Sequence, residues 1–235
     1  MRNEEKLIFV AFSAWFKMEQ ATCQIEMDGK QVWKLHGKIH RGEDLPAIIL
    51  KDGHQEWFQH GLRHREGDFP AITNPDGRKH WYKHGQCHRD GDFPAVIYIN
   101  GEQNWYKHGR RHRDNDLPAI IRPDGSQEWY QYGKLHRDGD MPAITNANGN
   151  QEWYKNGNRH RDNDQPAIVT SDEQKWYQHG ACHRDGDLPA VVNKNGKQEW
   201  YVEGMCHRDG NKPAVIHADG SQEWFLYGDS QKPIV

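Results

Sequence analysis

The stretch W-Y-K-H-G-Q-C-H-R-D-G-D-F-P-A-V-I-Y-I-N-G, residues 81–101, contains the pattern that recurs along this chain. Its Trp returns at residues 33, 57, 81, 105, 129, 153, 176, 200 and 224. The step is 24 residues, as from 57 to 81, except for one step of 23, from 153 to 176. Each Trp is followed four residues later by Gly, and in all but the last case by His-Arg and then Pro-Ala. Self-similarity at a fixed period predicts a tandem array, here of about eight repeats.

Each repeat also carries a hairpin signal. Pro-Ala is followed by β-branched or apolar residues, then by Asp-Gly or Asn-Gly, and then by Trp. These dipeptides favour two-residue type I′ turns, because they tolerate positive φ angles. They are Asp28-Gly29, Asp52-Gly53, Asp76-Gly77, Asn100-Gly101, Asp124-Gly125, Asn148-Gly149, Asn195-Gly196 and Asp219-Gly220. The exception, Asp172-Glu173, lacks the Gly and lies in the short repeat, which predicts an altered turn there.

A two-residue turn fixes which residues face each other across the hairpin. Around Asp76-Gly77 it places Ile72 opposite Trp81. The same count pairs Ile48 with Trp57, Val96 with Trp105, Ile120 with Trp129, Ile144 with Trp153, Val191 with Trp200 and Val215 with Trp224. Such pairs stabilise a sheet, but a lone hairpin is marginal, so the repeats are expected to stack.

The connector from His-Arg to Pro-Ala joins one hairpin to the next. The residue before its Pro is apolar in six of the eight repeats, so we expect it to plug the gap between neighbouring hairpins. These residues are Leu45, Phe69, Phe93, Leu117, Met141, Gln165, Leu188 and Lys212. Pro has no N–H for a strand ladder and favours an extended predecessor, so it marks entry into the next strand.

Composition excludes several classes of protein. Only 34% of residues are hydrophobic, yet ten Trp, nine Tyr and seven Phe are too many aromatics for a disordered chain. The net charge of −3, without a basic block, argues against specific nucleic-acid binding. The apolar run Leu7 to Phe16 is too short to span a bilayer, which argues against a membrane role, and we interpret it as a capping strand. Four Cys without a disulfide or metal-site spacing favour a cytoplasmic protein with reduced thiols.

The layout W-x-x-G-x-x-H … D-G resembles the MORN repeat. Residues 81–101 resemble more closely a divergent MORN-like variant of bacterial, phage and giant-virus proteins, although D-x-P-A stands here where that variant has Gly-Pro-Ala. The resemblance covers roughly residues 28–228 and implies stacked β-hairpins in an elongated, single-layer twisted sheet. It also implies a scaffold or oligomerisation role, with antitoxin-like proteins among the relatives.

The predicted architecture is therefore all-β, an elongated array of about eight stacked 24-residue hairpin repeats. We assign residues 1–27 to an N-terminal capping segment, residues 28–228 to the array and residues 229–235 to a C-terminal tail. No cofactor or metal is expected, since the Cys-His pairs of the repeat lie on adjacent residues that point to opposite faces of a strand.

The His-Arg…Asp ladder has two interpretations. It could form a polyvalent stripe that binds anions or nucleotides. Alternatively, each Arg pairs with an Asp of its own or the next repeat, while each His holds the connector by bonding a backbone carbonyl. Repetition in every unit favours the second interpretation. The candidate binding residues are His64, Arg65, His88, Arg89, His112, Arg113, His136, Arg137, His160 and Arg161, with the Tyr residues Tyr82, Tyr106 and Tyr154, which we expect to be exposed.

A second aromatic-rich column precedes the Gly that follows each Trp. It holds His36, His60, His84, His108, Tyr132, Asn156, His179, Glu203 and Tyr227. Its tolerance of different residues predicts a solvent-facing position where specificity for a partner could be encoded.

For function, the sequence favours a non-enzymatic scaffold that binds a protein partner and could form homo-oligomers. A viral, phage or bacterial accessory protein that acts on a host factor in the cytoplasm would fit the repeat type. The alternatives are an anion- or nucleotide-binding sponge and an antitoxin-like inhibitor. An enzyme is disfavoured because the triplet H-R-D recurs in repeat after repeat, whereas a catalytic site is built once.

Overall fold

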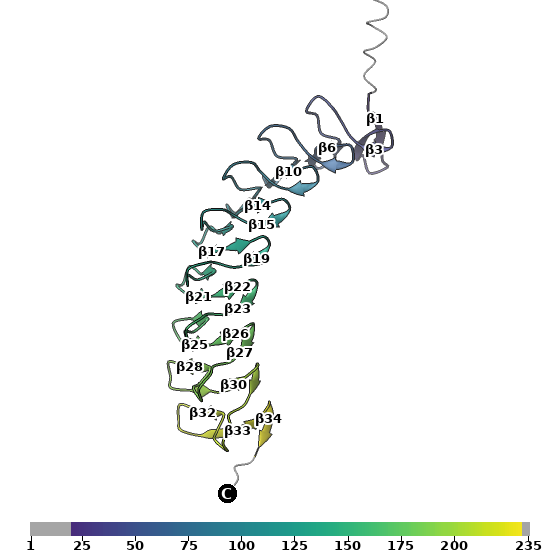
Figure 1. The fold of residues 1–235 in the computed structure, drawn as a ribbon. Coiled ribbons are helices and arrows are strands. Elements are labelled where there is room, and N and C mark those ends of the chain that lie inside the picture. Colours follow the sequence, from purple (N-terminus) through teal and green to yellow (C-terminus); the bar gives the residue numbers. More distant parts are fainter. Residues whose placement is uncertain (1–19, 232–235) are drawn as a thin grey trace, which may run out of the picture. The chain divides into compact units, whose positions relative to one another are not determined.

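The computed structural model describes residues 20–231, and in that range it contains β-strands and no helix (Figure 1). The expected capping strand at residues 7–16 lies outside the described residues. The described residues divide into two compact blocks, residues 20–87 and residues 88–231. Within residues 20–231 there is no helix of the length and apolarity needed to cross a membrane.

The N-terminal block contains an open antiparallel ladder in the order β1, β2, β4, β5, β8, β9. Short hairpins project from it: β3 pairs with β2, β6 with β7 and β10 with β11. The bounds are β1 Thr22–Ile25, β2 Gln31–Leu35, β3 Lys38–Ile39, β4 Ile48–Ile49, β5 Gln55–Glu56, β6 Phe58–Gln59, β7 Leu62–Arg63, β8 Ile72–Thr73, β9 Lys79–His80, β10 Tyr82–Lys83 and β11 Gln86–Cys87.

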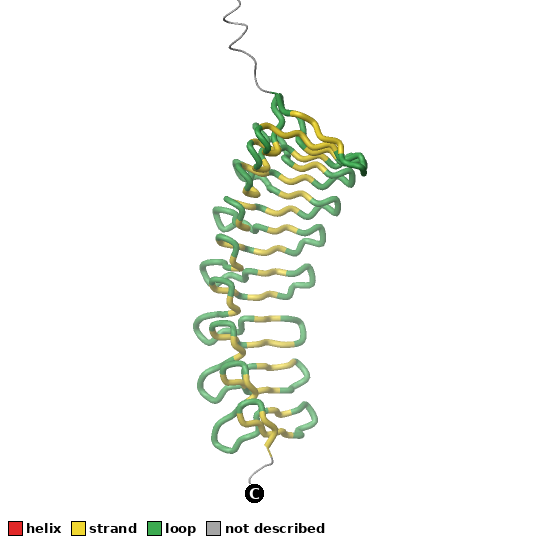
Figure 2. Tube along the Cα trace, turned by 90° about the vertical axis from the view of Figure 1, so that its right-hand side faces the viewer, coloured by secondary structure: helices red, strands yellow, loops and turns green. Residues whose placement is uncertain are grey.

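The C-terminal block repeats this plan. Its main ladder strands, which follow one another as successive rungs in Figure 2, are β12 Val96–Ile97, β13 Gln103–Asn104, β16 Ile120–Ile121, β17 Gln127–Glu128, β20 Ile144–Thr145, β21 Gln151–Glu152, β24 Ile168–Val169, β25 Glu173–Lys175, β28 Val191–Asn193, β29 Gln198–Glu199, β32 Val215–Ile216 and β33 Gln222–Leu226. Its short hairpin strands are β14 Tyr106–Lys107, β15 Arg110–Arg111, β18 Tyr130–Gln131, β19 Lys134–Leu135, β22 Tyr154–Lys155, β23 Asn158–Arg159, β26 Tyr177–Gln178, β27 Ala181–Cys182, β30 Tyr201–Val202, β31 Met205–Cys206 and β34 Asp229–Gln231. The prediction of an all-β array of regularly spaced hairpins is confirmed.

The prediction of type I′ turns at the Asp-Gly and Asn-Gly dipeptides is wrong. In the hairpin between β8 and β9, the N–H of Asn74 donates to the carbonyl of Arg78 at 3.0 Å, and that of Gly77 donates to the carbonyl of Asn74 at 2.9 Å. Of the three loop residues 75–77, only Gly77 has a positive φ. This is a three-residue loop, in which a type I turn is followed by a left-handed Gly.

The extra loop residue shifts the register by one. Ile72 lies opposite His80, so the predicted pairing of Ile72 with Trp81 is wrong. The same correction applies to the other predicted pairs: Ile48 faces Glu56, Val96 faces Asn104, Ile120 faces Glu128, Ile144 faces Glu152, Val191 faces Glu199 and Val215 faces Glu223. The seven Trp residues from Trp57 to Trp200 lie just outside the strands and are buried, whereas Trp33 and Trp224 lie within β2 and β33.

The altered turn expected in the short repeat is confirmed. Thr170 donates its N–H to the carbonyl of Glu173 at 3.0 Å, which leaves a two-residue loop of Ser171 and Asp172. Ile168 still faces Lys175, the residue just before the Trp, as in the other repeats. The missing residue is therefore absorbed in the loop, and the spacing between strand and Trp is preserved.

Two-residue turns of the type I′ kind occur instead in the short hairpins. Each has a residue of positive φ followed by a positive-φ Gly, for example His84 at 49° and Gly85 at 82°. A left-handed non-Gly residue is strained, so its recurrence in nine turns requires compensation from neighbouring groups. The pairs are His36-Gly37, His60-Gly61, His84-Gly85, His108-Gly109, Tyr132-Gly133, Asn156-Gly157, His179-Gly180, Glu203-Gly204 and Tyr227-Gly228.

The core is formed by the Ala of each Pro-Ala and the Trp that follows, together with the Ile or Val after most of these Ala residues. All eight of these Ala residues are 0% exposed, and seven Trp residues are 5–7% exposed. Successive repeats are joined here by main-chain bonds: Trp105 donates its N–H to the carbonyl of Ala119, and Trp129 donates to Ala143, both at 2.8 Å. A side chain larger than methyl would separate the chains that these bonds hold together.

The residues before Pro do not plug the gap between hairpins. Leu45, Phe69, Phe93, Leu117, Met141 and Leu188 are 37–57% exposed on the connector loops. The main chain of Ala fills that gap, which leaves the preceding side chain on the outer side. At the other end of the array, residues 229–231, which we assigned to the tail, form β34 and pair with β33.

We predict that Ala119→Leu lowers the free energy of unfolding by about 1–3 kcal/mol, because a larger side chain overpacks a closed core. Urea unfolding monitored by Trp fluorescence would measure this. Ala147→Leu is the matched control, since Ala147 lies exposed in a hairpin loop. Equal stability of the Ala119 variant and the parent would contradict the described core.

Candidate functional site

The connectors hold the charged columns of the repeat, and an Arg–Trp contact organises each of them. The guanidinium carbon of Arg113 lies 3.8 Å from the ring centre of Trp105, and that of Arg161 lies 3.9 Å from Trp153. The same contact recurs at 3.7–3.9 Å between Arg41 and Trp33, Arg65 and Trp57, Arg137 and Trp129, Arg184 and Trp176, and Arg208 and Trp200. Such cation–π contacts stabilise by about 0.5–2 kcal/mol, more when desolvated.

Apart from that of Arg41 in the first connector, each of these guanidiniums also pairs with an Asp of the preceding connector. Arg113 donates from Nε and Nη2 to the two carboxylate oxygens of Asp92, each at 2.7 Å. Arg161 binds Asp140 in the same way at 2.7 and 3.0 Å. The other pairs are Arg65–Asp44, Arg137–Asp116, Arg184–Asp164 and Arg208–Asp187. The expected Arg–Asp pairing is thus present, but the partner lies in the preceding repeat and not in the same or the next one.

The same Asp usually binds the Trp through its main chain. The indole Nε1–H of Trp129 donates to the carbonyl of Asp116 at 3.0 Å, and that of Trp153 donates to Asp140 at 3.1 Å. Trp57, Trp176, Trp200 and Trp224 make the equivalent bond to residues 44, 164, 187 and 211. Five Trp residues are therefore held between two connectors, with the Asp of one and the Arg of the next on them: Trp57, Trp129, Trp153, Trp176 and Trp200.

The His of the His-Arg pairs joins neighbouring repeats in a different way from the one expected. In seven of the eight pairs its Nδ1 accepts the N–H of the left-handed residue in the next short hairpin, as His64 does from His84 at 3.2 Å, whereas the Nδ1 of His112 is buried without a partner among the described residues. In every pair except that of His40, Nε2 contacts the carboxylate two residues on, as His88 does with Asp90 at 2.9 Å. A backbone carbonyl was expected as partner, and a backbone N–H is found. An accepting Nδ1 requires the neutral imidazole with the proton on Nε2.

Ring stacking adds to this bond and explains the residues at the strained turn position. His84 stacks on His64 with ring centres 4.5 Å apart, and Tyr132 stacks on His112 at 4.4 Å. Similar stacks join His40 and His60, His88 and His108, His160 and His179, and His207 and Tyr227. All nine residues of this column are exposed, so the predicted solvent-facing position is confirmed, and the stacked rings among them also join one repeat to the next.

The candidate Tyr residues are half-buried, so the expectation that they are exposed is wrong. Tyr154 donates its hydroxyl to Glu152 at 3.0 Å, and Arg159 donates to the same carboxylate at 3.1 Å. Burial and this bond raise the pKa of Tyr154 to about 12. The Tyr154 hydroxyl is therefore part of a hydrogen-bond network with Glu152 and Arg159, next to the main ladder.

The pKa values of the titratable side chains follow from their hydrogen bonds and their burial. The hydrogen bonds from Arg113 and Arg161 hold the pKa values of Asp92 and Asp140 below their usual range. Burial, together with the charge of His60, lowers the pKa of His40. Burial raises the pKa of the Cys87 thiol to about 12, which keeps it protonated.

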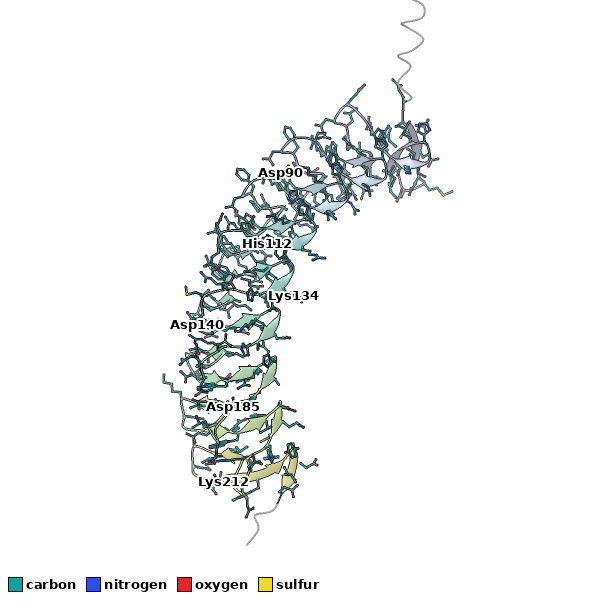
Figure 3. All side chains as sticks on the ribbon, viewed as in Figure 1. Asp90, His112, Lys134, Asp140, Asp185 and Lys212 are labelled. Carbon is teal, nitrogen blue, oxygen red and sulfur yellow. The ribbon has the colours of Figure 1, made fainter. Side chains whose placement is uncertain are left out.

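The ten predicted His and Arg residues all lie in the connectors, whereas Tyr82, Tyr106 and Tyr154 lie in β10, β14 and β22. The His and Arg residues are His64, Arg65, His88, Arg89, His112, Arg113, His136, Arg137, His160 and Arg161. In the C-terminal block, Asp140 of a connector and Lys134 of β19 lie on opposite sides (Figure 3). Most of their donors are engaged between repeats, and anion binding by the row stays a prediction. Among residues 20–231, no three His, Cys, Asp or Glu side chains are grouped so as to hold a metal ion.

Sequence reasoning missed two features of the connectors. One is the exposure of the apolar residues before Pro, which their alternation with charged residues could have indicated. The other is the direction of the Trp indole N–H groups toward the interior, for which the sequence contains no signal.

Neither a protein-family model nor a curated protein matches this sequence.

We predict that acid destabilises the array through the Arg-paired carboxylates. A lowered pKa in the folded state means that the unfolded chain binds more protons, so this stability is present at neutral pH. This contribution to stability is lost as the pH falls below 3.8, the ordinary pKa of Asp, toward the lowered pKa of Asp92 and Asp140 in the folded state. Urea unfolding between pH 7 and pH 3 measures the loss. The double variant Asp92→Asn/Asp140→Asn should be less stable at pH 7 and show a flatter acid dependence. An unchanged pH profile would refute the assignment.

Proposed function

We propose that this chain is a non-enzymatic repeat scaffold that binds a protein partner along its connectors. The observation that supports this most is the row of large apolar side chains that precede Pro in six of the eight connectors. In the C-terminal block Phe93 is 55% exposed, Leu117 37%, Met141 47% and Leu188 43%. Exposed apolar groups that recur on one side of a molecule are typical of interaction surfaces.

The polar surroundings of this row fit the same role. Carboxylates flank each apolar residue, and the side chains of Asp90 and Asp138 are 73% and 80% exposed. An apolar centre with a polar rim is the usual anatomy of a protein interface. The hairpin repeat is consistent with a MORN-like protein, a family in which scaffold roles are common. A partner with apolar anchors and neighbouring basic residues would complement the connectors.

The double variant Leu117→Ser/Met141→Ser tests this proposal. We expect capture of the partner from the native source to fall about tenfold or more, equivalent to about 1.4 kcal/mol, because apolar anchors dominate interface energies. Capture is measured by affinity purification with quantitative mass spectrometry.

Met205→Ser is the matched control, since Met205 is 40% exposed on β31, outside the connectors. Both variants should unfold within about 0.5 kcal/mol of the parent, as surface substitutions do. Equal capture by parent, control and double variant would rule out the connectors as the binding surface. Capture of only further copies of this chain would assign the row to self-association.

A further inference from the structure

The first connector contains an Arg without the usual carboxylate. Arg41 lies over Trp33, with 3.7 Å between its guanidinium carbon and the ring centre, and donates from Nη1 to the carbonyl of Pro46 at 3.1 Å. Six later connectors add bonds from Nε and Nη2 to an Asp, as between Arg65 and Asp44 at 2.7 and 2.8 Å. The Nε and Nη2 of Arg41 have no such partner among the described residues, and neither atom is buried.

Gln20 occupies the position that Asp has in the later connectors. β1 pairs with β2 in the register that β4 has with β5, so Gln24 corresponds to Ile48. Counting back four residues from each leads to Gln20 and to Asp44, respectively. Gln20 also precedes Arg41 by 21 residues, the separation found in most of the later Arg–Asp pairs. An amide is neutral, so the chain supplies no charge here where the later connectors place a carboxylate.

The last connector shows the opposite exchange. It has Asn211 at the Asp position, and the following repeat has Gln231-Lys232 where the others have His-Arg. Asp is thus replaced where no Arg follows it, whereas Arg41 is present although no Asp precedes it. Pairing within the array therefore does not account for Arg41. A second copy stacked end to end would place Asn211 opposite Arg41, which argues against this chain as the source of the missing carboxylate.

Arg41 lines a pocket of about 540 Å³ at the start of β1 (Figure 1). The lining combines the guanidinium with apolar side chains and two polar ones: Gln20, Trp33, Leu35, Glu43 and Leu45. Leu45 is 40% exposed. Pockets of this size hold small ligands or a short stretch of peptide. An open guanidinium fork beside apolar side chains suits a carboxylate that has an apolar group next to it.

The guanidinium of Arg41 is held in place before any ligand binds. The ring of Trp33 fixes its plane, and the bond to the carbonyl of Pro46 fixes its rotation. A planar fork oriented in this way binds a carboxylate through two parallel bonds and loses little side-chain entropy. The six later Arg–Asp pairs have this geometry, with N–O distances of 2.6–3.3 Å. Arg41 therefore has the arrangement that binds a carboxylate in six other connectors.

We propose that this pocket binds an acidic segment of a partner protein, in which the carboxylate of an Asp or Glu accepts the Nε–H and Nη2–H of Arg41. An apolar residue next to that carboxylate contacts Leu35 and Leu45. This inference rests on the proposed scaffold function and adds an acidic anchor at the N-terminal end of the row of connectors.

The probe is the dipeptide N-acetyl-Asp-Leu-amide, and its matched control is N-acetyl-Asn-Leu-amide, which lacks the charge. We titrate each into the full chain at pH 7 and follow the Arg Nε–H signals by ¹H–¹⁵N NMR, with Arg41→Lys to assign the signal. The Arg41 signal should move downfield and saturate with the Asp peptide alone. The signal of Arg113, which already binds Asp92, should stay in place. No response of Arg41, or equal responses to both peptides, would overturn the proposal.

Gln20→Asp tests whether the missing carboxylate defines the site. The new carboxylate should bind Arg41 within the chain, move its signal downfield without peptide, and weaken peptide binding about tenfold or more. Gln20→Asn is the matched neutral control and should bind the peptide as the parent does. Gln20 is exposed, so both variants should fold. Glu43→Gln removes a negative charge from the pocket lining and should strengthen binding. Undiminished binding by Gln20→Asp would show that the peptide binds elsewhere.

Two other occupants would give different results. If sodium acetate saturates the Arg41 signal at the same concentration as the Asp peptide, the pocket binds any carboxylate, and the assignment to a peptide fails. If the double variant Glu4→Gln/Glu5→Gln moves the Arg41 signal without peptide, the chain itself occupies the pocket, and the proposal fails. None of these readouts uses the native partner, so they are independent of the capture experiment.

Discussion

The position of one indole ring determines how each repeat meets the next. Trp153 donates from its main chain to Ala167 ahead of it and from its Nε1 to Asp140 behind it, while Arg161 covers its face and binds the same Asp140. A 24-residue repeat with few aliphatic residues has no core of its own. Its stability therefore depends on contacts that every repeat makes to both neighbours, as in other repeat proteins. The Arg and Asp columns belong to this joint as much as the Trp does.

The all-β class and the repeat boundaries could be predicted from the sequence, because Pro, Gly and alternating apolar residues determine strands and turns within a few residues of themselves. The register did not follow. Asp76-Gly77 can close a two-residue loop or end a three-residue one, and the dipeptide looks the same in both. What decides is the main-chain bond from Trp to the Ala of the next repeat, as between Trp57 and Ala71. This bond joins residues that are about half a repeat apart, and it lies outside the hairpin. The residue preferences of hairpin turns therefore cannot predict the register that the bond requires.

The candidate site was found by its residue types, but the partners within it could not be derived. Arg113 and Asp92 are 21 residues apart, and nothing local distinguishes Asp92 from other Asp residues as partner. The turn at His84-Gly85 was also missed, since His is not a usual residue for a type I′ turn. Its strain is offset by the bond to Nδ1 of His64 and by ring stacking, both of which come from the neighbouring repeat. Residues that look variable and exposed in one repeat thus acquire a role only when two repeats are considered together.

The contacts of each Trp with the Arg and Asp columns explain why the residue before Pro can vary while the repeats stay stacked. The Asp of each connector contributes two independent groups, a carboxylate for Arg and a carbonyl for Trp. In the connector with Phe93, Asp92 lacks the positive φ of Asp116 and Asp140, and the buried indole N–H of Trp105 has no partner among the described residues. The carboxylate of Asp92 nevertheless keeps both bonds to Arg113, and this ion pair and the cation–π contact of Arg113 with Trp105 preserve the stacking. The main-chain bond is then the part of the contact that can be given up. A change of one side chain before Pro can therefore alter the surface that a partner meets, while the contacts that hold the repeats together stay in place.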